Sequence, residues 1–126
     1  MKRIIFAFAL MFFLIGFNFF CFYTVSEIGA EALEKLDYIY GTLAVGDASK
    51  TAEECEKFTE YWLSEQHILS LIVRHNLLEQ TTSSVARFVP LSEFGEKGEL
   101  ASEINRCRIL IEEIWDSERP LLRNIF

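Results

Sequence analysis

The chain has 126 residues, of which 51% are hydrophobic and 14% aromatic, and its formal net charge is −7. Residues 27–126 are enough chain for one small domain with a single core. They contain ten basic and nineteen acidic residues. Nucleic acids and anionic lipid surfaces both select clustered lysine and arginine, so this acidic balance excludes both classes of partner for that part of the chain.

The N-terminal segment from Ile4 to Val25 is uncharged and strongly apolar. Its 22 residues include fourteen Ile, Leu, Phe or Val, and as a helix they would span about 33 Å, close to the thickness of bilayer hydrocarbon. A cleaved signal peptide has a shorter apolar core, and the best cleavage pattern, Ala30-Glu31-Ala32, falls inside the next predicted helix. We therefore predict a retained transmembrane anchor over residues 1–26, in contact with the bilayer through residues 4–25.

The charges that flank this segment predict its orientation. Lys2 and Arg3 precede the segment, whereas Glu27, Glu31 and Glu34 follow it. Because positive flanks stay in the cytoplasm, the N-terminus is predicted to be cytoplasmic. Residues 27–126 would then form an extracytoplasmic helical domain at the cell membrane.

Beyond the anchor, apolar residues recur at helical spacing, and no stretch alternates apolar and polar residues as a strand would. Four stripes are present: Ile28, Ala32, Leu36, Ile39 and Leu43; Ala48 to Ile72; Leu78 to Val89; and Leu100 to Ile114. The predicted fold class is all-α, with one N-terminal transmembrane helix followed by a small bundle of about four helices.

The breaks between these stripes are predicted loops. The first is Gly46-Asp47 and the second covers residues 90–98. Pro90 is predicted to end the third helix of the bundle and Pro120 the fourth, because proline lacks an amide donor. Gly46-Asp47 has a weak counterpart in Gly95-Glu96, which suggests two stacked helical hairpins.

Trp62, His75 and Glu79 are candidate interaction residues. His75 and Glu79 lie one helical turn apart and could supply two metal ligands, but a zinc site needs three or four. His75 at a helix start, paired with Glu79, is the simpler interpretation, and Trp62 stands at a core-facing position. A groove near Trp62 and His75 would instead suit a ligand- or metal-sensing module.

Glu31, Glu34 and Asp37 are candidate interaction residues on the acidic side of the chain. Residues 27–65 contain ten acids and three bases. Such a surface is either a solvated face that aids solubility or a binding face for a basic partner.

Cys55 and Cys107 have two interpretations: a disulfide between the second and fourth bundle helices, or two free buried thiols. Catalytic signals are absent from the sequence, since Ser83-Ser84 lacks the glycines of a nucleophile elbow and no glycine-rich phosphate loop occurs. We therefore expect no enzymatic activity, no cofactor and no metal.

The stretch WLSEQHILSLIVRHNLLEQTTSSVARF, with its spacing of Trp62, His75 and Glu79, resembles an uncharacterised bacterial membrane family labelled domain of unknown function 4363. The closing residues Arg123 to Phe126 are similar as well. This chain departs from the family pattern after the histidine, where acids are usual and Asn76 and Leu77 stand here. The resemblance implies no assigned activity and an accessory role beside other membrane proteins.

Together these features predict a single-pass, membrane-anchored accessory protein without catalytic activity. It would bind or stabilise another membrane or envelope protein. The alternative is the sensing module described above for Trp62 and His75.

Overall fold

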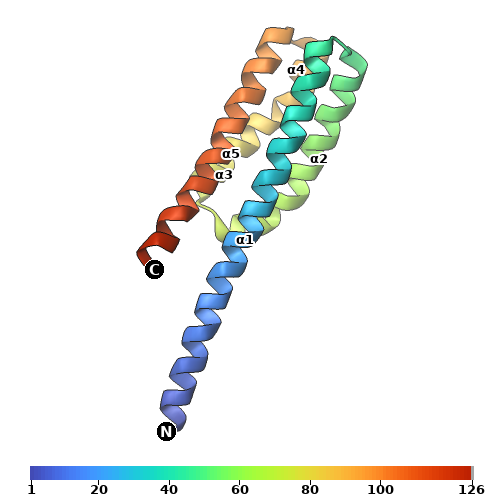
Figure 1. Ribbon diagram of the computed structural model, residues 1–126. Helices are drawn as coiled ribbons and strands as arrows, with labels where there is room; N and C mark the ends of the chain where they lie inside the picture. Colours follow the sequence, from blue (N-terminus) through green and yellow to red (C-terminus); the bar gives the residue numbers. More distant parts are fainter. Residues whose placement is uncertain (126) are drawn as a thin grey trace.

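The structure is a computed structural model that describes the backbone of residues 1–125 and the side chains of residues 1–116. Over that backbone there are five helices and no strand: α1 (Lys2–Val45), α2 (Ala48–Ile72), α3 (His75–Ala86), α4 (Phe88–Phe94) and α5 (Lys97–Ile125). The predicted all-α fold, a long apolar N-terminal helix followed by a helical bundle, is confirmed (Figure 1).

Helix α1 passes through two environments without a break. None of its residues up to Thr24 is buried, whereas one face is buried from Val25 onward. The buried residues are Val25, Ile28, Ala32, Leu36, Ile39 and Leu43. These include all five residues of the first predicted stripe. The boundary expected at residue 26 therefore lies inside one continuous helix, so the apolar segment and the bundle share a backbone element.

The bundle has four antiparallel legs, formed by α1, by α2, by α3 together with α4, and by α5. The α1 leg packs against α2 and α5, and the α3–α4 leg packs against the same two neighbours. Among the described residues no Cα atom of α2 comes within 8 Å of a Cα atom of α5, so these two legs are diagonal. The α1–α2 and α4–α5 turns lie at the distal end, and the α2–α3 turn lies where α1 leaves the bundle (Figure 1).

Large aromatic side chains fill the centre of the bundle. Trp62, Phe58 and Phe88 are each at most 2% exposed. The Phe58 and Phe88 rings stack with their centroids 5.6 Å apart, which joins α2 to α4. Burying a side chain of this size stabilises the fold by about 1.5–3 kcal/mol.

The loop predicted over residues 90–98 is wrong. Helix α3 ends at Ala86 and α4 covers Phe88–Phe94, which leaves only Gly95 and Glu96 between α4 and α5. Pro90 lies in the first turn of α4. Backbone amides in a first turn have no acceptor within the helix, so a missing donor there breaks no hydrogen bond.

The predicted end of the last helix at Pro120 is also wrong. Helix α5 continues to Ile125 and is 29 residues long. An interior proline removes one backbone hydrogen bond. Pro120 stands near the end of a long helix, and the loss of this one bond does not end it.

The predicted break at Gly46-Asp47 is confirmed, and its hydrogen bonds explain it. Gly46 has a φ of 90°, in the left-handed region. Its amide donates to the carbonyl oxygens of Leu43 and Thr42 at 3.1 and 3.2 Å, and the amide of Asp47 donates to Thr42 at 3.3 Å. The Asp47 carboxylate then accepts from the Lys50 amide at 3.1 Å and caps α2.

Replacement of this glycine is expected to destabilise the bundle. Gly46→Ala should lower the free energy of unfolding by about 1 kcal/mol, because an L-residue is strained in the left-handed region. The matched variant Gly41→Ala lies inside α1, where a new Cβ meets nothing within 4 Å, and it should raise that free energy by about 0.5–1 kcal/mol. Guanidinium unfolding of the full chain in detergent, followed by circular dichroism, measures both. Changes of the same sign would contradict the assigned turn.

Candidate functional site

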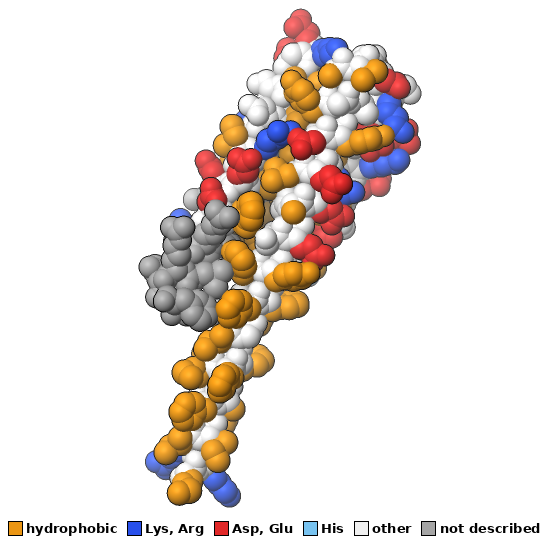
Figure 2. Space-filling view, viewed as in Figure 1, with side chains coloured by type: hydrophobic (Ala, Val, Ile, Leu, Met, Phe, Trp, Pro, Cys, Tyr) orange, Lys and Arg blue, Asp and Glu red, His pale blue; other side chains and the backbone are white. Residues whose placement is uncertain are grey.

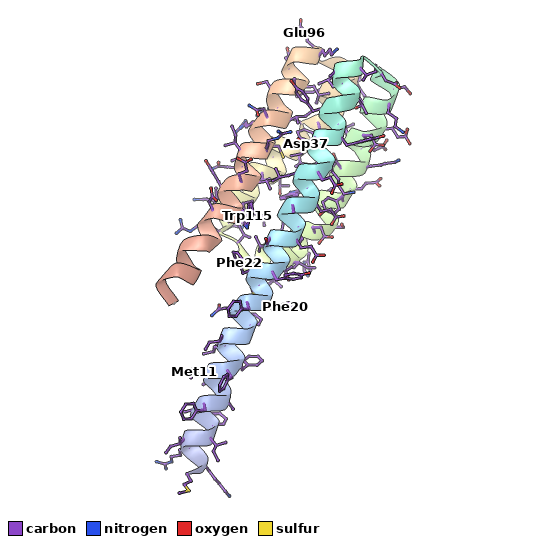
Figure 3. The ribbon with its side chains drawn as sticks, viewed as in Figure 1. Met11, Phe20, Phe22, Asp37, Glu96 and Trp115 are labelled. Carbon is purple, nitrogen blue, oxygen red and sulfur yellow. The ribbon has the colours of Figure 1, made fainter. Side chains whose placement is uncertain are left out.

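The first functional feature is an apolar sleeve, defined as the large hydrophobic side chains of residues 4–23 around α1. Thirteen of these side chains are between 47% and 71% exposed. Figures 2 and 3 show them projecting on all visible sides below the bundle, with Met11 and Phe20 among them. The most apolar 18-residue window has a mean hydropathy of 2.5 and no buried residue, so α1 is long and apolar enough to cross a membrane. A signal sequence would share these properties.

The second feature is a shallow groove between α1 and α2 with a volume of about 420 Å³. We call it the acidic groove. It is lined by Glu31, Glu34, Lys35, Tyr38, Ile39, Glu54, Lys57 and Phe58.

Both lysines of the acidic groove are engaged by neighbouring side chains. The Lys57 Nζ lies 3.3 Å from a carboxylate oxygen of Glu53 and 3.6 Å from one of Glu54. The hydrogen bond and charge of Glu53 raise the pKa of Lys57, which therefore stays protonated. The Lys35 Nζ lies 4.9 Å from the centroid of the Tyr61 ring. Among the described residues, neither lysine forms an ion pair with Glu31 or Glu34.

The carboxylates on the α1 side of the groove remain open to solvent. The Tyr61 hydroxyl donates to Glu31 Oε2 at 3.3 Å. Burial and the neighbouring Glu31 carboxylate raise the pKa of Tyr61, so its hydroxyl remains a donor at neutral pH. Glu34 is exposed, and no cation among the described residues pairs with it. The groove therefore offers acceptor oxygens to a cationic group.

Asp37 does not belong to the acidic groove. Its Oδ1 pairs with Nη2 of Arg108 on α5, and Figure 3 shows it on the stretch of α1 that faces α5. A helix turns about 100° per residue, so Asp37 stands about 120° around α1 from Glu31. The three acids that the sequence grouped together thus divide into two sites: Glu31 and Glu34 line the groove, and Asp37 ties α1 to α5.

Trp62 and His75 are not brought together either. Trp62 is 1% exposed, and its Nε1 donates to Thr82 Oγ1 at 3.0 Å, which makes it a core residue. His75 is the first residue of α3; its Nε2 lies 2.9 Å from Glu79 Oε1, and the two side chains are 82% and 66% exposed. The cavity beside Trp62 holds only about 10 Å³ and is not lined by His75. A sensing groove at these residues has no structural support.

Cys55 and Cys107 are free thiols, and both are fully buried. They lie on the diagonal legs α2 and α5, whose Cα atoms are all more than 8 Å apart in the described part of the chain. A disulfide needs about 4.4–6.8 Å between Cα atoms, so this pair cannot be bridged in the folded bundle. Burial raises the pKa of Cys55 to about 11 and that of Cys107 to about 12.

A buried polar cluster around Glu103 was not predicted from the sequence. Glu103 is 9% exposed, and its Oε1 accepts from the Ser84 hydroxyl at 2.8 Å. Guanidinium nitrogens of Arg87 and Arg106 lie 3.8 Å from its oxygens. The sequence feature that could have predicted it is the position of Glu103 on the core face of the last stripe, three residues after Leu100. The cluster joins α3 to α5 and satisfies a carboxylate that would otherwise be costly to bury.

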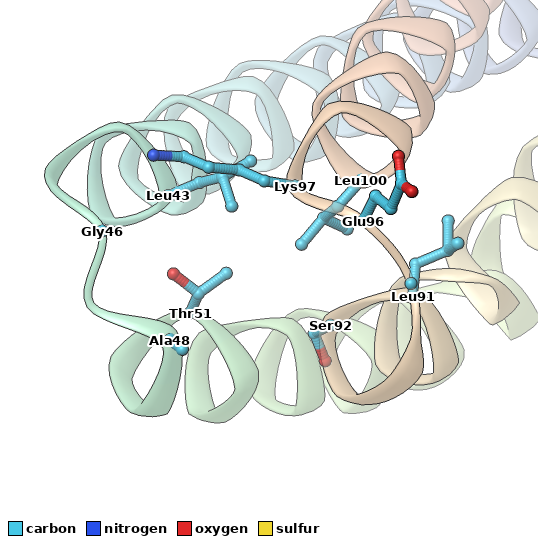
Figure 4. A pocket seen from close by; sticks show the side chains of 10 residues that line it. Leu43, Gly46, Ala48, Thr51, Leu91, Ser92, Glu96, Lys97 and Leu100 are labelled. Atoms are coloured by element: carbon cyan, nitrogen blue, oxygen red, sulfur yellow. The ribbon is translucent and has the colours of Figure 1, made fainter.

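A small cavity of about 160 Å³ lies at the distal end, between the α1–α2 and α4–α5 turns (Figure 4). Leu43, Leu91 and Leu100 give it apolar walls. The buried Thr51 hydroxyl already donates to the Asp47 carbonyl at 2.8 Å. The cavity is therefore a gap in packing between two turns. In the part of the chain that the structure describes, no three His, Cys, Asp or Glu residues gather as a metal site.

The sequence of this chain matches a known protein family. The family described as domain of unknown function (DUF4363) matches residues 19–125. The chain belongs to this family. The match begins within the apolar sleeve and covers the whole bundle, so the junction between the two lies inside the DUF4363 region. No curated protein and no solved structure matches the chain.

The two buried thiols of this DUF4363 protein are expected to be inert. At pH 8, Cys55 and Cys107 in the folded protein should react with a disulfide reagent at least about 100-fold more slowly than free cysteine, because the thiolate is the reactive form. The thiolate fraction rises only as the pH approaches 11 for Cys55 and 12 for Cys107. Timed thiol titration before and after unfolding measures this. A peptide that links Cys55 to Cys107 in unreduced protein would contradict the diagonal arrangement.

Proposed function

We propose that this DUF4363 protein is a single-pass membrane-anchored accessory protein without catalytic activity. Residues 4–25 of α1 cross the cell membrane, the N-terminus is cytoplasmic, and residues 27–126 form an extracytoplasmic bundle that binds or stabilises another membrane or envelope protein. The observation that carries this proposal is the exposed apolar sleeve at the start of the helix that also supplies one wall of the core.

Retention of the anchor is supported by where the bundle core begins. Cleavage after Ala32 would remove Val25, Ile28 and Ala32, which are three of the six buried residues of α1. Each large aliphatic side chain lost from a core removes about 1.5–3 kcal/mol of stabilisation. Since small domains have only about 5–15 kcal/mol in total, a cleaved chain would lose much of its stability.

The short distance between the acidic groove and the end of the apolar segment favours a membrane-bound partner. Glu31 and Glu34 follow the end of the apolar segment by six and nine residues, which is about 9–14 Å along the helix. A partner that reaches the groove must therefore come close to the bilayer surface. Its contact face would carry Lys or Arg, because the groove presents carboxylates to solvent.

The topology is tested in intact cells with a membrane-impermeant maleimide. A cysteine introduced as Ser102→Cys, on the exposed surface of α5, should be labelled, because the bundle lies outside. A cysteine introduced as Lys2→Cys should react only after the membrane is permeabilised. Labelling of Lys2→Cys alone in intact cells would reverse the orientation and contradict the proposal.

The acidic groove is tested by charge reversal. The double variant Glu31→Lys and Glu34→Lys should slow association with a basic partner about tenfold at low salt and have little effect at high salt, because such charges mainly steer encounter. Stability should change by less than about 1 kcal/mol, since both groups are exposed. The matched control, Glu112→Lys with Glu113→Lys, makes the same charge change on exposed positions of α5.

The measurement is recovery of co-purifying membrane proteins from detergent-solubilised membranes at low and high salt. The groove variant should lose partner at low salt, and the α5 control should retain it. Equal recovery for the parent, the groove variant and the control at both salt concentrations would make the acidic face a solvated surface only.

A further inference from the structure

The packing of α2 against α1 shows which residue of α1 lies opposite each residue of α2, and so where α2 ends along the apolar segment. The Tyr61 hydroxyl lies 3.4 Å from the carbonyl oxygen of Ile28, and Leu69 lines the same cavity as Val25. Both helices rise about 1.5 Å per residue, so Leu71 lies opposite about residue 23 and the α2–α3 turn opposite about residue 20. Figure 1 shows this turn beside α1 where α1 leaves the bundle.

This level lies within the segment proposed to cross the bilayer. The uncharged segment begins at Ile4, and a hydrocarbon layer of about 30 Å takes up about 20 helical residues. The outer edge of the hydrocarbon is therefore expected at about residue 23. The α2–α3 turn reaches that edge. When α1 spans the bilayer, this end of the bundle must therefore contact the membrane.

The side chains at this end of α2 suit an apolar environment. Leu71 is 80% exposed and Ile68 is 44% exposed. The segment from Gln66 to Val73 contains no Asp, Glu, Lys or Arg, and its exposed polar residues are His67 and Ser70. The next charge is the basic Arg74. The distal half of α2 is different, since Glu53, Glu54, Glu56 and Glu60 crowd it. Helix α2 thus changes from acidic to apolar as it approaches the sleeve.

We propose that the α2–α3 end of the bundle, formed by Ile68, Leu71 and Arg74, is seated in the outer interfacial layer of the bilayer that α1 crosses. Leu71 enters the boundary between headgroups and acyl chains, and Ile68 lies beside it. Arg74 extends its guanidinium toward lipid phosphates while its aliphatic stem stays in the apolar layer. The inference rests on the proposed function, because it requires α1 to be inserted.

The contact with lipid is apolar in origin. Arg74 is the one lysine or arginine in residues 66–80, so the contact of this segment does not depend on anionic lipid and a zwitterionic bilayer suffices. Two attachments, α1 and the α2–α3 end, fix the tilt of the bundle on the surface. The acidic groove is then held at one height and one orientation toward a neighbouring membrane protein.

The test uses the full chain with Cys21→Ala, reconstituted in phosphatidylcholine liposomes and carrying one spin label at a time. Cys55 and Cys107 remain, because both are fully buried. The test position is Leu71→Cys. The matched control is Leu63→Cys, which lies on the same helix two turns farther from the sleeve and is 55% exposed. Phe12→Cys, in the middle of the sleeve, reports insertion of α1.

For each spin label, the rate of collision with oxygen is compared with the rate of collision with a water-soluble nickel chelate. Oxygen concentrates in lipid, whereas the chelate stays in water. The labels at 71 and 12 should meet the chelate at least tenfold less often than the label at 63. If the label at 71 behaves like that at 63 while that at 12 is shielded, α1 is inserted and the interfacial contact is refuted. If the label at 12 also meets the chelate freely, the anchor and the contact are both refuted.

Discussion

The continuity of α1 across Val25 is the constraint on which the rest of the structure depends. Below this residue the helix is apolar on all sides, and above it the helix is apolar along one stripe and charged elsewhere. A hinge at this point would let a bundle move freely over a tether. An unbroken helix instead couples the position and tilt of the apolar sleeve directly to the core, because Val25 and Ile28 are packed against α2 and α5.

The two ends of the bundle consequently have different chemistry. The distal end carries the glycine turn at Gly46 and a small gap in packing. The other end has the α2–α3 turn, preceded by the exposed Ile68 and Leu71 and level with the end of the sleeve, and the carboxylates of Glu31 and Glu34 lie just beyond it. If α1 crosses the bilayer as proposed, this change from apolar to acidic along the bundle places the acidic groove close to the membrane surface.

The features that the sequence predicted are those that depend on local spacing. The stripe from Ile28 to Leu43 and the turn at Gly46 follow from helical periodicity and backbone freedom. The prediction at Pro90 was wrong because the effect of a proline depends on where a helix begins, and α4 begins at Phe88, two residues before Pro90. Asp37 was grouped with Glu31 by composition, although helical spacing puts them about 120° apart on α1. The packing of α5, which brings Arg108 to Asp37, could not be predicted from that spacing. The buried carboxylate of Glu103 likewise depends on partners from another helix.

Pulsed electron spin resonance of the full chain in a bilayer tests the continuity of α1 most directly. Spin labels at Phe13→Cys and Glu34→Cys, with Cys21→Ala, mark the sleeve and the bundle, and both positions are exposed. The 21 residues between them correspond to about 32 Å along one helix, so a single narrow distance distribution near that value is the predicted result. A broad or clearly shorter distribution would show a hinge near Val25 and contradict the account.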